Sequence, residues 1–495
     1  MSNLSFDMIV IGGGPGGHTA AEEAARYGAR VCIVEKAQWG GTCTHRGCIP
    51  TKALLTCSRH FAELKKLNRL GITAGETGYD FTAIRRHRDQ MVRIAALGVE
   101  KSLKDAGVEM KVGEGKIVSP GEVAWTNPAG QSEAMTARHI VVAWGSEPAL
   151  PPFPITRHLS SSPQSSALLI QAAIAASPSS SPSTQSSTLG TPPATPAPPH
   201  SSSRILTSDT FLQLTTLPQS VVIIGGGVIG VEFATFLAEL GVPVQIVEIF
   251  PTIIPYEEEE AATVLLKELN RIGVKVLTAT KIEDIREGPE GVCISAGKDG
   301  QAMELNAEYA LLCTGRRPRL DEESLINLGI RYDRRGVAVD ESQETNIAGI
   351  YAVGDVTGGI MLAHRAMQQG RALASRLFGD GSVTFQEDTV PSVTYSHPPI
   401  ARVGLTEKQA REKGWPVEIV RTDYGANIMA RTELAGQGFA KFIFHKSNLV
   451  GATIVGAGAP DLIASLSLAM TTGADLKTLK SWIIPHPTLT EVLKL

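Results

Sequence analysis

The stretch FDMIVIGGGPGGHTAAEEAARYGARVCIVE, residues 6–35, sets the architecture of the N-terminal part of the chain. It reads as an apolar strand, a glycine-rich turn, an alanine-rich helix and a second strand, which together make a βαβ unit. Gly12 allows the tight turn, Gly14 lets the backbone approach a pyrophosphate, and Gly17 lets the helix pack closely on the strand. Glu35 ends the second strand, where a carboxylate binds ribose hydroxyls. The unit predicts a dinucleotide-binding site.

The same pattern returns at residues 221–248, with Gly225, Gly227 and Gly230 in the turn and Glu248 at the end of the second strand. A carboxylate at this point accepts from a free ribose 2′-hydroxyl and repels a 2′-phosphate. No Lys or Arg occurs in residues 245–260. The second site is therefore predicted to prefer NAD over NADP, and two dinucleotide sites in one chain indicate electron transfer between two cofactors.

Composition excludes several classes of protein. The 495 residues are 43% hydrophobic and 19% charged, with a net charge of -4, which is typical of a globular protein and not of a nucleic-acid binder. No apolar stretch is long enough to span a membrane, and the N-terminus has no basic and apolar leader pattern. Six cysteines in a chain of this length do not indicate a secreted disulfide framework. We expect a cytoplasmic protein.

The segment GGTCTHRGCIPTK, residues 40–52, places Cys43 and Cys48 close enough to form a disulfide if the chain turns at Gly47. Pro50 suits an early helical position, so Cys48 is expected near a helix N-terminus, where the helix dipole and Lys52 favour its thiolate. A zinc site would need further ligands. Cys32 and Cys57 are available in the sequence, but Cys32 lies in a buried strand pattern, so no metal is predicted.

The chain resembles the pyridine nucleotide–disulfide oxidoreductases, and among them the branch that oxidises dihydrolipoyl groups. Besides the two glycine motifs, the resemblance rests on five segments: residues 40–55 (GGTC-x4-GCIPTKALL), 311–318 (LLCTGRRP), 345–356 (TNIAGIYAVGDV), 390–398 (VPSVTYSHP) and 486–491 (HPTLTE). It covers nearly the whole chain except residues 159–203. It implies an α/β fold with two Rossmann-like dinucleotide-binding domains and a C-terminal α+β dimerisation domain.

The resemblance also implies a role for each matching residue. Cys48 would face the flavin, Cys43 would exchange with the substrate disulfide, and Lys52 would lie beside the flavin, paired with Glu232. His486 would be the acid/base, oriented by Glu491. The remaining positions would bind FAD (Gly12, Gly14, Gly17, Glu35, Gly115, Asp355 and Ala363) or NAD (Gly225, Gly227, Gly230, Glu248 and Gly315).

The resemblance further implies partners. His486 lies at the opposite end of the chain from the cysteines, and in the family the acid/base of one subunit reaches the disulfide of the other, so a homodimer is expected. The electron donor would be a lipoyl-bearing protein of a 2-oxoacid dehydrogenase or glycine-cleavage system. No nucleic acid and no membrane span are expected.

The sequence divides into five parts. Residues 159–203 contain no Asp, Glu, Lys or Arg and are rich in Ser, Pro, Thr and Ala, which predicts a flexible insertion. The predicted parts are residues 1–157 (FAD domain with the cysteines), 158–203 (insertion), 204–317 (NAD domain), 318–385 (FAD-binding central segment) and 386–495 (dimerisation domain).

Other interpretations stay open at this point. The protein could reduce another small disulfide, although no basic residues for NADP lie near Glu248 and the last cysteine, Cys313, leaves no C-terminal redox pair. It could also be a non-catalytic flavoprotein subunit. Lys52 and Glu232 could form an ordinary surface pair. Asp355 could only cap a turn, and Glu491 could cap a helix. Trp144 and the Thr44-His45-Arg46 loop depart from the family pattern.

Overall fold

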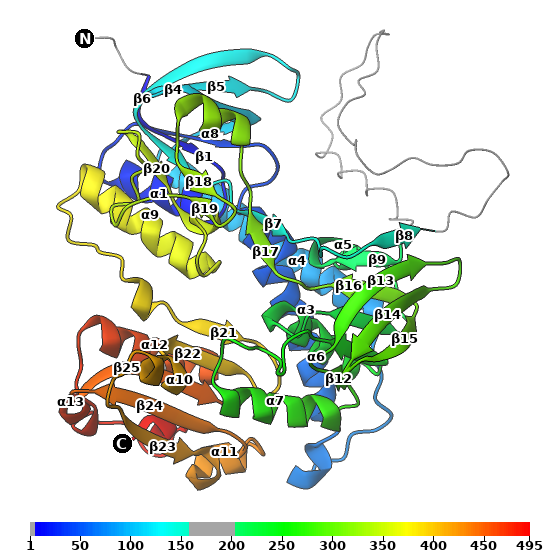
Figure 1. Cartoon of the computed structure of the whole chain (residues 1–495). Coiled ribbons are helices and arrows are strands. Elements are labelled where there is room, and N and C mark those ends of the chain that lie inside the picture. Colours follow the sequence, from blue (N-terminus) through cyan, green and yellow to red (C-terminus); the bar gives the residue numbers. More distant parts are fainter. Residues whose placement is uncertain (1–4, 158–202) are drawn as a thin grey trace, which may run out of the picture.

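The computed structural model describes residues 5–157 and 203–495, which form three bodies around a shared centre (Figure 1). The N-terminal body lies at the top of Figure 1, the second body, built around β10 (Val221–Ile224) and α6 (Val228–Glu239), at the right, and the C-terminal body at the bottom. The predicted insertion falls almost wholly outside the described residues.

The first body is built on a sheet whose parallel strands lie in the order β3-β2-β1-β6. Strand β20 pairs with β6 in parallel, and β5 pairs with β6 and with β4 in antiparallel. Ile9 and Val10 at its centre are fully buried, because parallel strands are covered on both faces. Its strands are β1 (Phe6–Ile11), β2 (Val31–Glu35), β3 (Glu109–Val112), β4 (Glu114–Ser119), β5 (Glu122–Thr126), β6 (Ser132–Val142) and β20 (Ile350–Ala352). Its helices are α1 (Pro15–Arg26), α2 (Gly41–Arg46), α3 (Cys48–Leu64), α4 (Phe81–Asp105), α8 (Glu322–Leu328) and α9 (Ala363–Phe378), with 3-10 turns η1 (Leu67–Leu70) and η2 (Gly354–Thr357).

The second body repeats the arrangement with a parallel sheet in the order β12-β11-β10-β16-β9, next to a four-stranded sheet in the order β15-β14-β13-β8. The first sheet comprises β9 (Ile205–Thr207), β10 (Val221–Ile224), β11 (Val244–Val247), β12 (Lys275–Leu277) and β16 (Tyr309–Leu312). The second comprises β8 (Ile155–Arg157), β13 (Lys281–Glu287), β14 (Val292–Lys298) and β15 (Gln301–Ala307), and the helices are α5 (Ser208–Phe211), α6 (Val228–Glu239) and α7 (Glu259–Arg271). Two short strand pairs complete the first two bodies. They are β7 (Ser146–Pro148) with β17 (Arg316–Pro318), and β18 (Tyr332–Asp333) with β19 (Gly336–Val337).

The C-terminal body is an antiparallel sheet in the order β21-β22-β25-β24-β23, covered by helices. Its elements are β21 (Ser392–Thr394), β22 (Ile400–Gly404), β23 (Glu418–Asp423), β24 (Phe439–His445), β25 (Asn448–Val455), α10 (Glu407–Glu412), α11 (Ile428–Thr432), α12 (Ala459–Thr471), α13 (Leu476–Lys480) and the 3-10 turns η3 (Glu387–Thr389), η4 (Tyr424–Ala426) and η5 (Leu489–Leu493). Two parallel dinucleotide-binding sheets and a C-terminal α+β domain confirm the predicted fold class.

One hydrophobic core joins the bodies. Leu54 and Leu55 of α3, Phe233 of α6, and Ile400 and Phe439 of the C-terminal sheet belong to the same buried cluster. Helix α3 therefore lies between all three bodies, so a residue on it can contact both other parts of the chain.

The chain leaves and re-enters the second body at one place. Arg157 at the end of β8 pairs in register with Glu287, and the Arg204 amide donates to the Glu287 carboxylate at 2.5 Å. Both ends of the predicted insertion therefore meet at Glu287.

Within residues 5–157 and 203–495, no helix has both the length and the apolar character needed to cross a membrane.

Candidate functional site

The first glycine loop is shaped by backbone contacts that exclude side chains. Gly12 has φ +115°, and a Cβ there would lie 2.2 Å from the carbonyl oxygen of Ala143. A Cβ on Gly17 would lie 1.9 Å from the carbonyl oxygen of Gly12, so only glycine lets α1 pack this closely. No atom lies within 4 Å of a Cβ position on Gly14, which therefore faces open space. This is the cradle that a cofactor pyrophosphate at a helix N-terminus requires.

The second loop repeats this geometry. Gly225 has φ +108° with the Cys313 carbonyl oxygen 2.3 Å from its Cβ position, and Gly230 has the Gly225 carbonyl oxygen at 2.0 Å. Gly227, like Gly14, faces open space. In both loops, therefore, the first and third glycines have no room for a side chain, and the middle glycine is open.

The two carboxylates after these loops are held in the same way. Glu35 accepts hydrogen bonds from the amides of Gly13 at 2.6 Å and Ala37 at 2.7 Å. Glu248 accepts from the amides of Gly226 at 2.6 Å and Phe250 at 2.8 Å. Each carboxylate is therefore fixed at the rim of its loop, where the ribose of a bound dinucleotide would lie.

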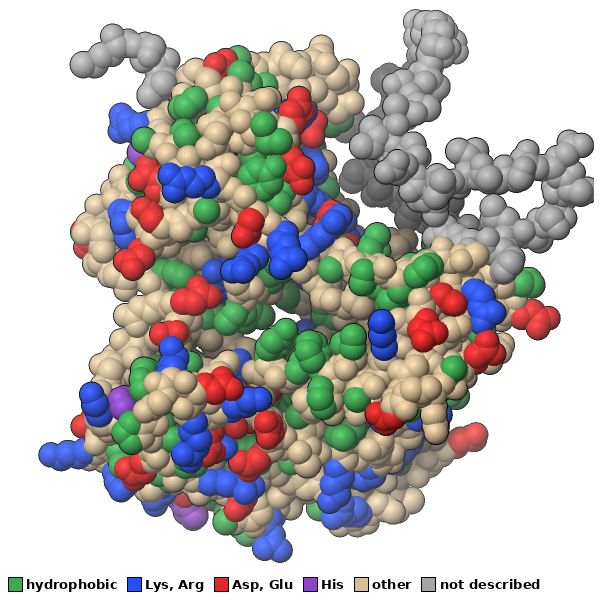
Figure 2. Space-filling model, in the orientation of Figure 1, with side chains coloured by type: hydrophobic (Ala, Val, Ile, Leu, Met, Phe, Trp, Pro, Cys, Tyr) green, Lys and Arg blue, Asp and Glu red, His purple; other side chains and the backbone are tan. Residues whose placement is uncertain are grey.

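One cavity of about 2230 Å³ joins both loops. Typical ligand pockets measure about 300–1,000 Å³, so this cavity has room for two dinucleotides and a substrate group. In Figure 2 the molecule is hollowed where the three bodies meet, and hydrophobic side chains gather at the hollow. Of the predicted site residues, those that line it are Gly12, Gly14, Glu35, Cys43, Cys48, Lys52, Gly115, Gly225, Gly227, Glu232, Glu248, Gly315, Asp355 and Ala363. Gly17 and Gly230 instead serve helix packing.

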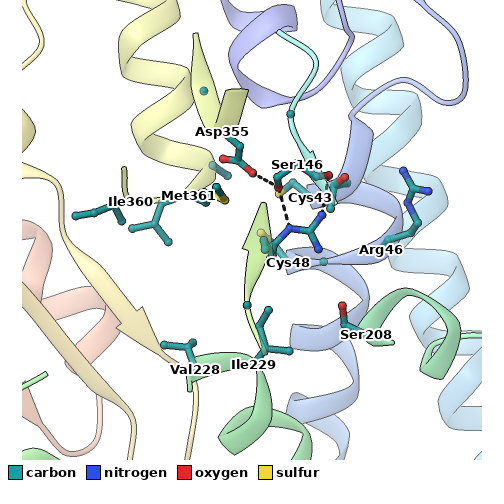
Figure 3. Close-up of a pocket in the computed structure, with 18 of the residues that line it drawn as sticks. Cys43, Arg46, Cys48, Ser146, Ser208, Val228, Ile229, Asp355, Ile360 and Met361 are labelled. Atoms are coloured by element: carbon teal, nitrogen blue, oxygen red, sulfur yellow. Dashed lines mark hydrogen bonds between the residues drawn. The ribbon is translucent and has the colours of Figure 1, made fainter. Parts of the chain in front are cut away.

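The two cysteines lie at the centre of this cavity. Cys43 is on α2, and α3 begins at Cys48, so Cys48 occupies the predicted helix N-terminus (Figure 3). Both are free thiols in this structure, and the Cys43 thiol donates to the Cys48 sulfur. That hydrogen bond holds the pKa of Cys48 below its usual value, with Lys52 acting in the same direction, and it raises the pKa of Cys43. Arg46 projects from α2 away from both sulfurs.

Lys52 and Glu232 form an ion pair in which the carboxylate is buried and the Lys52 side chain is 33% exposed. The Lys52 ammonium lies 2.8 Å and 3.0 Å from the two oxygens of Glu232, which is 3% exposed. Burial alone would lower the pKa of Lys52, but the Glu232 carboxylate raises it above its usual value. Tyr395 contacts both partners: its amide donates to Glu232 at 3.0 Å, and its ring centroid lies 4.6 Å from the Lys52 nitrogen. The buried Glu232 carboxylate distinguishes this pair from an ordinary surface pair.

Asp355 is linked to a distant part of the chain. Its carboxylate accepts from the Ser146 hydroxyl at 2.5 Å, and that hydroxyl accepts from Arg316 at 2.8 Å (Figure 3). Ser146 and Asp355 are 209 residues apart in the sequence, so this hydrogen bond does more than cap the local turn at Asp355. Asp355 thus has a fixed carboxylate, and it lines the cavity together with Ala363 at the start of α9.

His486 and Glu491 are paired but lie apart from this cavity. The His486 Nδ1 atom is 3.0 Å from Glu491 Oε1, and Glu491 also accepts from the Thr488 amide at 3.1 Å. The capping and orienting roles of Glu491 therefore coexist. The His486 side chain is 72% exposed, and His486 is not among the residues that line the cavity. A single subunit does not bring the predicted acid/base to the cysteines.

Several residues at the site were not found from the sequence. Tyr395 and Ser146 contact the ionic groups described above, and Trp144 lines the cavity. His397 bonds to Glu239 on α6. No local spacing could reveal these contacts, because each joins segments more than 150 residues apart.

Comparison with known proteins agrees with this arrangement. The family described as pyridine nucleotide-disulphide oxidoreductase matches residues 6–370, and its dimerisation domain matches residues 390–495. The dihydrolipoyl dehydrogenase of Chlorobaculum tepidum is 32% identical over 493 residues, which cover 99% of this chain and 96% of that protein. The dihydrolipoyl dehydrogenase of Geobacillus stearothermophilus is also 32% identical, over 99% of this chain and 95% of that protein.

Solved structures show the same fold. The HOCl-induced flavoprotein disulfide reductase RclA from Escherichia coli superposes with a TM-score of 0.77 at 24% identity, over 98% of both chains. Its Cu(II) complex superposes with a TM-score of 0.79 at 24% identity, over 99% of this chain and 98% of that one. The sequence matches, which span both dinucleotide-binding parts and the C-terminal domain, place this chain in the pyridine nucleotide-disulphide oxidoreductase family.

Proposed function

We propose that this flavoprotein disulfide oxidoreductase oxidises dihydrolipoyl groups with NAD. The observation that carries the proposal is the position of Cys43 and Cys48 in the cavity that joins the two dinucleotide loops. Relatives covering the whole chain at 32% identity are named dihydrolipoyl dehydrogenases, which supports this substrate class.

The proposed reaction is a thiol–disulfide exchange at Cys43. A substrate thiolate attacks the Cys43 sulfur of the Cys43–Cys48 disulfide, and Cys48 leaves as a thiolate. The second substrate thiol, after losing its proton to His486, attacks the substrate sulfur bonded to Cys43. The substrate leaves as a cyclic disulfide, and the two cysteines have gained its two electrons. A lowered pKa suits Cys48 as the leaving thiolate.

FAD, when bound at the first loop, would carry the two electrons from the cysteines to the nicotinamide cofactor. The residues proposed to hold it are those of the first loop with Glu35, Gly115, Asp355 and Ala363. Lys52, kept in place by Glu232, keeps a positive charge beside Cys48.

NAD is proposed over NADP because Glu248 lies buried at the rim of the second loop, with both oxygens held by backbone amides. A 2′-phosphate would meet this carboxylate, and a 2′-hydroxyl would donate to it.

A homodimer is proposed to complete each site. The C-terminal domain matches the dimerisation domain of the family, and His486 is exposed on it and outside the cavity. The second subunit would bring its His486 to Cys43. We propose a cytoplasmic protein that receives electrons from the lipoyl-bearing protein of a 2-oxoacid dehydrogenase or glycine-cleavage system.

Steady-state assays of the purified FAD-loaded protein test the proposal. Dihydrolipoamide with NAD should give the highest kcat/KM among the combinations of dihydrolipoamide or glutathione disulfide with NAD(H) or NADP(H). Faster turnover of glutathione disulfide with NADPH than of dihydrolipoamide with NAD would contradict it.

A further inference from the structure

A second buried carboxylate lies on the same helix as Glu232. Glu239 is the last residue of α6 and is 7% exposed. The hydroxyl of Ser58 on α3, itself fully buried, donates to Glu239 Oε2 at 2.6 Å. The Nδ1 atom of His397 bonds to Glu239 Oε1. The chemistry described above does not use this group of three residues.

The contacts of Glu239 repeat those of Glu232. Seven residues, or about 10 Å along a helix, separate the two carboxylates on one face of α6. Each carboxylate contacts one side chain from α3, Lys52 or Ser58. Each also contacts the segment after β21, through the Tyr395 amide or the His397 ring. Two matched contacts therefore tie α3, α6 and this segment together, one beside the cysteines and one two turns away.

The position of Tyr395 links the two contacts. Tyr395 is two residues before His397, it donates to Glu232, and its ring lies over the Lys52 ammonium. A buried carboxylate without its donors is unfavourable, so Glu239 holds both Ser58 and His397 to itself. Through His397 it holds the backbone that carries Tyr395.

We infer that Glu239, with Ser58 and His397, is a positioning residue that keeps Tyr395 and α6 in the arrangement that holds Lys52 beside Cys48. The inference rests on the proposed function, since it gives Lys52 the task of stabilising the Cys48 thiolate. Glu239 acts only through other residues.

The direction in which the ionisation of Cys48 shifts distinguishes a positioning role of Glu239 from a direct electrostatic effect of its charge. The titratable groups that act on Cys48 are Cys43 on α2, Lys52 on α3 and Glu232 on α6, and Tyr395 faces Lys52. Removing the negative charge of Glu239 would directly favour a thiolate, which lowers the pH at which Cys48 ionises. Loss of positioning withdraws the Lys52 charge from Cys48, which raises that pH.

The test is a pH titration of the long-wavelength absorbance that a Cys48 thiolate gives against bound flavin, in partially reduced FAD-loaded protein. Glu239→Gln keeps the shape of the side chain and removes its charge. We expect its titration midpoint to rise by roughly half a pH unit or more, which is about a three-fold change in the ionisation equilibrium. The matched control is Glu268→Gln, which neutralises another buried carboxylate of the same body, bound to Arg271 at 2.6 Å. The control should unfold at a lower temperature but keep the unmodified midpoint.

Ser58→Ala provides a milder second variant, because it removes one donor and leaves the charge. It should raise the midpoint in the same direction by a smaller amount. An unchanged or lowered midpoint in a folded, flavin-loaded Glu239→Gln or Ser58→Ala protein would overturn the inference. Absence of any titratable thiolate band in the unmodified protein would overturn the proposed function together with it, so the two failures can be told apart.

Discussion

The Cys48 sulfur accepts the Cys43 thiol proton in a hydrogen bond and faces the Lys52 charge, while Cys43 has a raised pKa. Because the pKa of Cys48 is lowered, its thiolate forms as pH rises through a midpoint below about 8.5, the usual value for a free cysteine. We predict that partially reduced protein shows a long-wavelength flavin–thiolate band that grows through such a midpoint. Cys48→Ser should abolish the band, and Cys43→Ser should retain it.

The two serine variants serve as controls for each other, because they differ only in which sulfur is lost. Visible absorbance spectra at matched FAD content measure the outcome. A band that survives in Cys48→Ser would reverse the assignment of the two thiols.

Glu248 is predicted to determine the choice of nicotinamide cofactor. Glu248→Ala removes the acceptor for a 2′-hydroxyl and the repulsion of a 2′-phosphate, so the NAD/NADP ratio of kcat/KM should fall by about tenfold or more. Glu283→Ala is the control, since it removes a different carboxylate, on β13, that lines the same cavity. Equal use of both cofactors by the unmodified protein would contradict the argument.

At this scale, the sequence predicted the residues whose type is demanded by local backbone geometry or by chemistry, such as Gly12, Gly225 and Cys48. It did not predict Ser146, Tyr395 or Glu239. These residues acquire their importance from partners that are far away in the chain, and a serine or glutamate carries no spacing signal of its own.

Strands with continuous apolar runs were predicted well, because burial on both faces leaves a clear pattern. Residues 6–11 and 221–224 form strands with the expected bounds. Helix α4 was not predicted, and its composition explains why: of its 25 residues only Arg88 and Leu103 are buried, so it lacks a broad apolar stripe. Glu491 was considered as a helix cap, and it forms a capping box with Thr488 that begins the 3-10 turn η5 and not an α-helix.

Strand β24 carries a buried lysine that joins the second and third bodies. Lys441, 4% exposed, lies 3.2 Å from Glu258, 2.9 Å from Glu260 and 2.7 Å from Glu407. Lys441→Met would leave these carboxylates without their shared cation, and we expect a loss of about 3–5 kcal/mol in the free energy of unfolding. Urea unfolding of the FAD-loaded protein measures it.

The surface pair Lys408–Glu259, at 4.0 Å with both side chains mostly exposed, provides the control for this prediction. Lys408→Met should cost less than about 1 kcal/mol. Equal losses in the two lysine variants would show that the buried network does not hold the bodies together.

The same network predicts a pH dependence. Hydrogen bonds from Lys441 and Arg411 hold the pKa of Glu407 below its usual value, so this residue contributes stability above the pKa of its unfolded form. That contribution is lost as pH falls through the lowered folded value. In Lys441→Met the folded pKa of Glu407 moves back toward the unfolded one, so melting temperatures measured from pH 6 downward should decline less steeply than those of the unmodified protein. A steeper decline would contradict the assignment.

For the whole molecule, the decisive feature is the separation of His486 from the cysteines. The apolar side chains of Leu468 and Ile483 are 64% and 91% exposed on the same domain, in keeping with a surface that a second subunit covers. Mixing Cys43→Ser with His486→Ala chains should recover about a quarter of full activity. Random pairing makes about half the dimers hybrid, and each hybrid has one intact site of two.

Each variant alone should be inactive with dihydrolipoamide, and each should remain dimeric and flavin-loaded by gel filtration and absorbance. Verified hybrids without recovered activity, or a fully active monomer, would contradict the shared site.

The paired bonds of Glu35 to Gly13 and Ala37, and of Glu248 to Gly226 and Phe250, have a consequence for inhibition. Both carboxylates would lie at the adenosine end of a bound ligand, and that end is chemically the same in flavin and nicotinamide dinucleotides. ADP, which consists of little more than this shared end, should therefore compete with either cofactor. Discrimination between the two cofactors must come from residues outside these two carboxylate contacts.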